Sequence, residues 1–180
     1  GLALGSGEVS LWELARAYVQ MANRGTAQPL VAAFDYAIAT PNRSIEDNWF
    51  PLIVDMLDDD RARAAAFGVD SVLNLPFPAA VKTGTSSDYR DTWTVGFSRD
   101  YTVATWVGNF SGDRTIRVSG VTGAAPLWQR IMLHLHRDRP PDGFAAPTDL
   151  VRRPICTATG LKPTDTCNSV IVEYLAPEDL

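Results

Sequence analysis

Hydrophobic residues near the start of the chain recur every three or four positions, which is the spacing of one helix face. Ser10 and Glu13 flank the first turn in the pattern of a capping box, in which each side chain binds an otherwise unpaired backbone N–H. Gly25 is a natural stop signal. We therefore predict a helix after Ser10, with an apolar face made by Leu11, Leu14, Ala15, Tyr18, Val19 and Ala22.

Two further segments carry the same period. One runs from Asn48 toward the acidic residues 58–60, and its apolar positions are Trp49, Leu52, Ile53, Met56 and Leu57. In the other, Thr122 is placed to cap a helix that holds Pro126 in its first turn and ends before Pro140. Its apolar positions are Ala125, Leu127, Trp128, Ile131, Met132 and Leu135.

The middle of the chain has the texture of β-strands. Residues 92–97 and 101–107 are rich in β-branched and aromatic side chains, and only three residues, 98–100, separate them. Pro76 and Pro78 disfavour helix just before the stretch that ends at Thr85. The pattern predicts a hairpin preceded by a third strand, and so three antiparallel strands in succession.

Composition narrows the class of protein. The chain has 180 residues, 46% of them hydrophobic, which is enough for one domain-sized core and a small appendage. A formal net charge of −5 excludes nucleic acid and anionic membrane surfaces as expected partners. No apolar stretch approaches the ~20 residues of a membrane-spanning helix, and no signal peptide is visible. The start at Gly1 instead of a methionine reads as a piece of a longer protein.

A metal site is not predicted. Cys156 and Cys167 stand close together, but a zinc site would need two more ligands at suitable spacing. His134 and His136 are the only histidines, and we expect them on different faces of a helix, toward solvent. The simplest alternative for the two cysteines is a pair of unrelated free thiols.

The segment with candidate chemistry is Lys82, Thr83, Gly84, Thr85 and Ser86. A phosphate-binding loop is excluded, because the Walker pattern requires a glycine six positions before the lysine and Pro76 stands there. Taken alone, Lys-Thr-Gly also fits an ordinary strand end with a glycine bulge. The surrounding residues decide between these readings.

Those residues resemble the bifunctional (class A) penicillin-binding proteins. Residues 75–81 leading into residues 82–86 are similar to the third signature of penicillin-recognising serine enzymes. Further similar segments lie in order along the chain, at residues 2–10, 91–96, 106–108, 123–128 and 156–167. The region 28–48 matches least well.

The resemblance implies a mixed α/β fold, of the α+β type, in which helices flank an antiparallel sheet. Residues 1–147 would be the C-terminal part of the penicillin-binding transpeptidase domain, and residues 148–180 a post-catalytic tail. We expect an exposed sheet edge at residues 81–85, with Lys82, Thr83 and Thr85 facing a groove and the hairpin 92–107 pairing behind it. Gly84 would let the backbone of a peptide or β-lactam lie close to the strand edge. Lys82 and the Thr83 hydroxyl would hold the substrate carboxylate, the Thr85 N–H would be an oxyanion-hole donor, and Ser86 would support them.

The family's nucleophile is missing from these 180 residues. A search of every lysine finds no Ser-x-x-Lys, since Ala79 and Thr159 stand three positions before Lys82 and Lys162. No asparagine has a serine two positions before it, so Ser-x-Asn is missing as well. In the family both elements lie upstream of the segment that resembles residues 2–10, so truncation is expected. The glycosyltransferase domain, the membrane anchor and the first two sheet strands would be absent for the same reason.

The expected partners are peptidoglycan stem peptides, β-lactam antibiotics and the missing N-terminal part of the same protein, with no cofactor and no membrane contact by this segment. That substrate implies an extracytoplasmic location, which permits disulfides, and we expect one between Cys156 and Cys167. Gly160 and Pro163 suit a chain that doubles back between them. The alternatives are a β-lactamase or D,D-carboxypeptidase of the same fold, and a non-catalytic binding module.

Overall fold

The computed structural model describes residues 7–32, 42–43, 49–115 and 119–179. The chain divides into two compact units, Gly1–Ala145 and Ala146–Leu180. This division falls two residues before the boundary drawn from the sequence. Each unit is described by itself below.

The first unit is built on a three-stranded antiparallel sheet. Its order is β3 (Ala80–Thr85), β4 (Asp91–Phe97) and β5 (Thr102–Gly108). The register sets Gly84 opposite Trp93 and Trp93 opposite Trp106. The predicted hairpin and the third strand before it are therefore confirmed.

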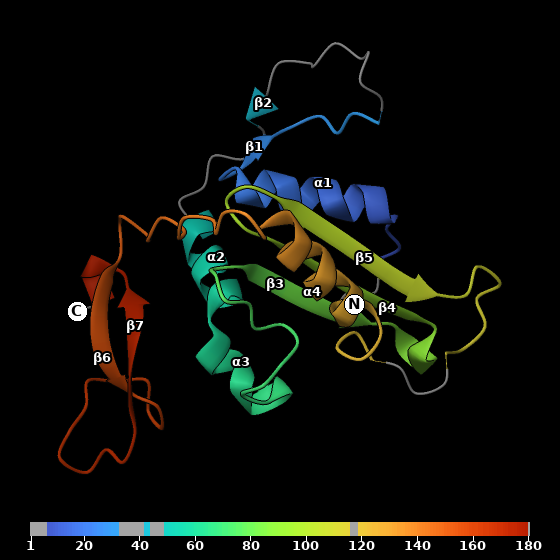
Figure 1. The fold of residues 1–180 in the computed structure, drawn as a ribbon. Coiled ribbons are helices and arrows are strands. Elements are labelled where there is room, and N and C mark those ends of the chain that lie inside the picture. The colour runs from blue at the N-terminus through green and yellow to red at the C-terminus, as the bar shows by residue number, and fades with distance from the viewer. Residues whose placement is uncertain (1–6, 33–41, 44–48, 116–118, 180) are drawn as a thin grey trace. The chain divides into compact units, whose positions relative to one another are not determined.

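Helices cover both faces of this sheet (Figure 1). On one face α4 (Ala124–Leu135) packs Trp128 and Met132 against Val81 and Val103, and all four side chains are buried. On the other face α1 (Leu11–Ala22) and α2 (Trp49–Asp58) lie over Ala80 and Phe97. The result is the expected fold, an antiparallel sheet between layers of helix.

The predicted capping box begins α1. The Glu13 N–H donates to Ser10 Oγ at 3.2 Å, and the Ser10 N–H donates to Glu13 Oε2 at 2.9 Å. The hydrogen bond from the Ser10 N–H, followed by the one from the Ser10 hydroxyl, lowers the pKa of the Glu13 carboxyl. The helix ends at Ala22, before Gly25, as the sequence predicts.

The acidic residues 58–60 do more than end a helix. Within the described residues α2 begins at Trp49, Asn48 lying outside them, and it ends at Asp58. A further helix, α3 (Asp60–Phe67), follows at once and was not predicted. Asp59 is its N-cap, and its carboxylate accepts from the N–H groups of Arg61 and Ala62 at 2.9 Å. An N-cap aspartate and a helix-ending charge look alike in a sequence.

Two expectations around α4 were wrong. The N-cap is Gly123, without a side-chain hydrogen bond, because the Thr122 hydroxyl is engaged with the Ser119 N–H at 2.9 Å. His136 is buried, only 6% exposed, and not solvent-facing. Its Nε2 lies 2.9 Å from Ser98 Oγ, so the turn of the β4–β5 hairpin closes over it. His134 is exposed, as expected.

A short antiparallel pair joins β1 (Thr26–Ala27) to β2 (Asn42–Arg43) beyond the end of α1. The 28–48 stretch, predicted as extended chain and loop, lies largely outside the described residues. Among the described helices, none is long and apolar enough to span a membrane.

The second unit is a hairpin with a cross-link. Strands β6 (Val151–Cys156) and β7 (Val170–Leu175) pair antiparallel, and a 3₁₀ turn, η3 (Pro177–Asp179), follows. Cys156 and Cys167 form a disulfide, the pairing that the sequence predicts. The bridge closes the loop between the two strands.

Candidate active-site groove

Strand β3 is an edge strand. It pairs with β4 on one side, and no other strand of the described residues pairs with its outer side. The exposed edge predicted for the Lys-Thr-Gly segment is therefore present. Such an edge carries unpaired backbone N–H and C=O groups that can accept an added strand.

The register decides which residues offer those groups. Just beyond β3, the Ser86 N–H donates to the Asp91 carbonyl at 2.9 Å. In an antiparallel ladder hydrogen-bonded and non-hydrogen-bonded pairs alternate, so the next pair, Thr85 and Thr92, is a non-hydrogen-bonded one. The backbone groups of Thr85, and by the same alternation of Thr83, consequently point away from β4 toward the free edge.

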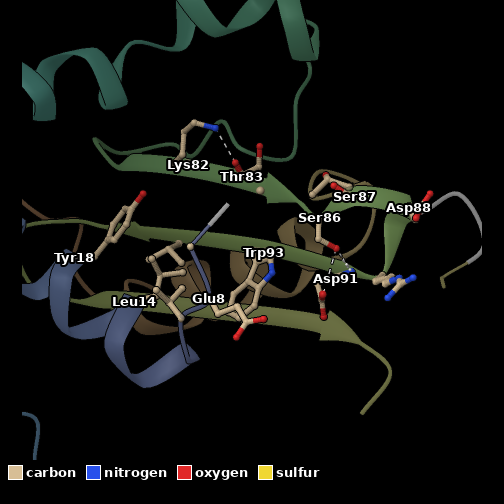
Figure 2. Close-up of a pocket in the computed structure, with 16 residues that line it drawn as sticks. Glu8, Leu14, Tyr18, Lys82, Thr83, Ser86, Ser87, Asp88, Asp91 and Trp93 are labelled. Atoms are coloured by element: carbon tan, nitrogen blue, oxygen red, sulfur yellow. Dashed lines mark hydrogen bonds between the residues drawn. The ribbon is translucent and has the colours of Figure 1, made fainter. Parts of the chain in front are cut away.

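A groove of about 1020 Å³ runs along this strand (Figure 2). Lys82, Thr83, Gly84, Thr85 and Ser86 all line it. The sheet contributes Trp93 and Val95 as well, and α1 contributes Leu14 and Tyr18. Gly7, Glu8 and Val9, which precede α1, also line it.

The side chains of the motif do not share one face. Because side chains alternate along a strand, Lys82 and Gly84 stand on the α1 face, whereas Thr83 and Thr85 stand on the α4 face. The Thr85 hydroxyl accepts a hydrogen bond from the Gly120 N–H at 2.9 Å. The prediction that the side chains of Lys82, Thr83 and Thr85 all face one groove therefore needs correction. Thr85 lines the groove, but its hydroxyl is bound on the opposite, α4 face of the sheet.

Lys82 is exposed, and its Nζ donates to the Thr83 carbonyl at 2.7 Å. Among the ion pairs of the described residues, none includes Lys82. Its charge is therefore available to an anionic ligand in the groove. Figure 2 shows the ammonium beside Thr83 at the edge of the sheet.

Gly84 is not required by the packing of the fold. A Cβ added there would meet Trp93 Cβ at 3.5 Å, an ordinary contact distance. At Gly96, by contrast, the added atom would lie 2.6 Å from the Ala80 carbonyl oxygen and 2.7 Å from Trp128. The open side at position 84 therefore serves the groove, while Gly96 serves the core.

A tight turn holds the end of the site strand. Ser86 Oγ accepts from the Asp91 N–H at 2.8 Å and lies 3.2 Å from the Asp91 carboxylate. Between them a 3₁₀ turn, η2 (Ser87–Tyr89), includes Asp88 and Tyr89 at positive φ. The ion pair of Arg114 with Asp88 at 3.1 Å secures this turn from outside. The Ser86 hydroxyl therefore stabilises this turn.

Sequence reasoning missed the opposite wall of the groove. Leu14 and Tyr18 lie one helical turn apart on α1, and that spacing was the available signal. Tyr18 packs edge-on against Phe97 with ring centroids 6.3 Å apart, and burial raises the pKa of its phenol. Trp93 was seen as a strand residue, not as part of the site. No cluster of metal-ligating side chains occurs within the described residues.

Several known proteins are similar in sequence to this chain. The chain is 31% identical over 163 residues to penicillin-binding protein 1C of Escherichia coli, which covers 88% of this chain and 20% of that protein. It is 29% identical over 118 residues to penicillin-binding protein 1A of Clostridium perfringens, covering 66% of this chain and 13% of that protein. This chain is a relative of the penicillin-binding proteins.

The fold agrees with that relationship. A crystal structure of penicillin-binding protein 1A from Haemophilus influenzae matches 99% of this chain with a TM-score of 0.74 and 21% identity, and the match covers 33% of that structure. The chain therefore spans a third or less of the relatives that it matches. No family model matches it.

Proposed function

We propose that this chain forms the Lys-Thr-Gly wall of a serine-type D,D-transpeptidase that cross-links peptidoglycan stem peptides and that β-lactams acylate as substrate mimics. The observation that carries the proposal is the free edge of β3, where the backbone of Thr83 and Thr85 points outward beside an unobstructed Gly84. The relationship to proteins named for penicillin binding supports the same reading.

In this site the acyl donor lies along β3 as an added strand. The Thr85 N–H faces the reacting carbonyl oxygen and stabilises the charge that develops on it, a contribution that typically amounts to ~10²–10³ in rate. The Lys82 ammonium binds the substrate carboxylate, and the Thr83 side chain, which lines the groove from the α4 face, contributes its hydroxyl at the strand edge. Ser86 holds the turn that keeps Thr85 in place.

The nucleophile comes from another part of the protein. Neither Ser-x-x-Lys nor Ser-x-Asn occurs in the 180 residues, so this chain provides one wall and not the acylated serine. The substrate places the domain outside the cytoplasmic membrane, anchored through the part that precedes this segment. The family resemblance puts both missing elements in that part.

The test compares the two lysines of the chain in the complete protein. Lys82→Ala is expected to slow acylation by a fluorescent penicillin at least about tenfold, because the carboxylate loses its charged partner. Lys162→Ala in the second unit is the matched control and should acylate at the parent rate. Equal rates in the two variants would remove Lys82 from the site.

The same experiment separates the alternatives. A β-lactamase would release the hydrolysed antibiotic rapidly, whereas a transpeptidase keeps the acyl-enzyme. A D,D-carboxypeptidase would release the terminal residue of a stem peptide without joining it to an acceptor amine. A non-catalytic module would form no adduct in the complete protein.

A further inference from the structure

A row of aromatic side chains crosses the sheet from the groove outward. The register aligns Gly84, Trp93 and Trp106 directly opposite one another on three strands, so all three stand on the same face. The ring centroids of Trp93 and Trp106 lie 6.3 Å apart, and those of Trp106 and Phe110 lie 5.2 Å apart. We call Trp93, Trp106 and Phe110 the aromatic row.

The aromatic row does not serve the hydrophobic core. Neither of the two buried clusters of the described residues includes any of its three side chains. Phe110, two residues beyond β5, is completely exposed to solvent. Trp93 and Trp106 are half-buried. The row is therefore a partly exposed aromatic surface beside the groove, and exposed apolar surface of this kind is a feature of binding sites.

The row is fixed in orientation and lies next to acidic groups. The Trp106 indole N–H donates to Asp91 Oδ1 at 2.9 Å, which holds the ring. Asp91 and Glu8 line the groove together with Trp93 (Figure 2). The surface therefore offers flat apolar faces next to carboxylate oxygens that accept hydrogen bonds.

This combination selects the occupant. Trp106 and Ser86 each donate to one Asp91 oxygen and leave further lone pairs open. A purely apolar group on the aromatic row would take water from these lone pairs and from the Glu8 carboxylate without replacing the lost hydrogen bonds, which is costly. A sugar ring has an apolar C–H face for the aromatic rings and hydroxyl groups at its rim that can donate to the carboxylates. It fits both parts of the surface at once.

We infer that the aromatic row binds sugar rings of the glycan strand that carries the stem peptide. This inference rests on the proposed function, in which the peptide itself lies along β3. Trp93 is adjacent to Gly84 and so joins the two subsites. One substrate then spans the site, its peptide on the strand edge and its glycan on the rings.

The test uses the 180-residue chain and a peptide-free saccharide, the β-1,4-linked tetramer of N-acetylglucosamine. We expect a saturable change in tryptophan fluorescence and in the indole N–H signals of Trp93 and Trp106 in NMR spectra. Phe110→Ala should weaken binding by about tenfold, the size expected for one aromatic contact. Because Phe110 is fully exposed, this variant leaves the core intact.

Two controls make the outcome specific. Trp49→Ala on α2 removes an aromatic residue outside the row and should leave saccharide binding unchanged. Lys162→Ala in the second unit should do the same. The saccharide titration does not depend on acylation by a β-lactam, so this subsite and the proposed transpeptidase role can fail separately. The inference is overturned if no saturable change occurs, if Phe110→Ala binds like the parent, or if an apolar phenylacetamide perturbs the row while the saccharide does not.

Discussion

Thr85 Oγ1 accepts a hydrogen bond from the backbone N–H of Gly120 at 2.9 Å. The contact ties the end of the site strand to the segment that leads into α4, 35 positions away in the sequence. Gly120 is buried and has no space for a side chain, since an added Cβ would lie 2.8 Å from the Gly84 carbonyl oxygen. The strand edge is thus held from behind by a residue that does not touch the groove.

Removing the Thr85 hydroxyl should therefore destabilise the first unit. Thr85→Val keeps the shape but leaves the buried Gly120 N–H without its acceptor, and we expect a loss of about 1–3 kcal/mol in the free energy of unfolding. Thr85→Ser keeps the hydroxyl and is the matched control. Denaturant unfolding measures both, and a Thr85→Val variant as stable as Thr85→Ser would contradict this role.

The two strand glycines should respond in opposite ways. Gly84→Ala should leave the free energy of unfolding within about 1 kcal/mol of the parent, because its Cβ meets only ordinary contacts. Gly96→Ala should cost about 1–3 kcal/mol, because its Cβ would overlap the Ala80 carbonyl and Trp128. Thermal unfolding of the two variants checks this contrast.

In the complete protein Gly84→Val should fold and yet acylate poorly with penicillin. Two methyl groups at this position would stand where the ligand backbone must approach the strand. Gly84→Ala provides an intermediate step, so the rates should fall from Gly to Ala to Val. Equal acylation rates for the three would mean that no ligand passes over position 84.

The 180-residue chain alone should form no covalent adduct with a β-lactam. Ser86 and Ser87 have no lysine placed to activate them, and the Ser86 hydroxyl is engaged with Asp91. Intact-mass measurement after prolonged incubation with a reactive penicillin checks this. A stoichiometric mass gain on any serine would overturn the assignment of the nucleophile to another part of the protein.

The stability of the first unit should depend on pH through Asp58. Its Oδ1 accepts from the Ala79 N–H at 2.7 Å, linking the end of α2 to the start of β3. Burial is the largest cause of its pKa shift, and it raises the pKa. A raised pKa in the folded state means that the folded protein holds the proton longer than the unfolded chain. Protonation of Asp58 therefore adds to the free energy of unfolding, and its contribution is complete at pH values below the pKa of the unfolded chain. It is lost as the pH rises through the pKa of the folded protein.

Asp58→Asn keeps an oxygen acceptor for Ala79 and removes this titration. The difference in unfolding free energy, parent minus Asp58→Asn, should fall as pH rises through the carboxyl range and then stay level. Asp58→Ala should be less stable than Asp58→Asn at every pH, because Ala79 loses its acceptor. Parallel stability curves for the parent and Asp58→Asn would refute the titration.

Loss of the disulfide should affect the second unit alone. Cys156 and Cys167 are 11 positions apart in the sequence. Closing a loop of this length stabilises a chain by about 3 kcal/mol in the entropy model. Strands β6 and β7 are largely exposed, and Cys156 is among the few buried side chains of this unit. In Cys156→Ala/Cys167→Ala, amide exchange of residues 151–175 should speed up while that of β3–β5 stays at the parent rate. Unchanged protection of the hairpin would show that the bridge is dispensable.

The local elements of this protein are determined by its sequence. The capping box of Ser10 and Glu13, the apolar period of α1 and α4, and the β-branched strands at 92–97 and 101–107 act over a few residues, so they can be read directly. The Lys-Thr-Gly motif also identified the strand that lies at the edge of the sheet. The local predictions that failed concerned residues with two possible roles. Asp59 is the N-cap of α3 instead of the end of a helix, and Thr122 accepts from Ser119 instead of capping α4.

The site itself was decided by the tertiary structure. Only the strand register shows that the Thr85 backbone faces the free edge while its hydroxyl is bound on the other side of the sheet. The same register aligns Gly84 with Trp93 and Trp106, which lie 9 and 22 positions further along the chain. His136 became buried because the hairpin turn at Ser98 closes over it. Each of these depends on contacts between distant segments, and no local period in the sequence encodes them.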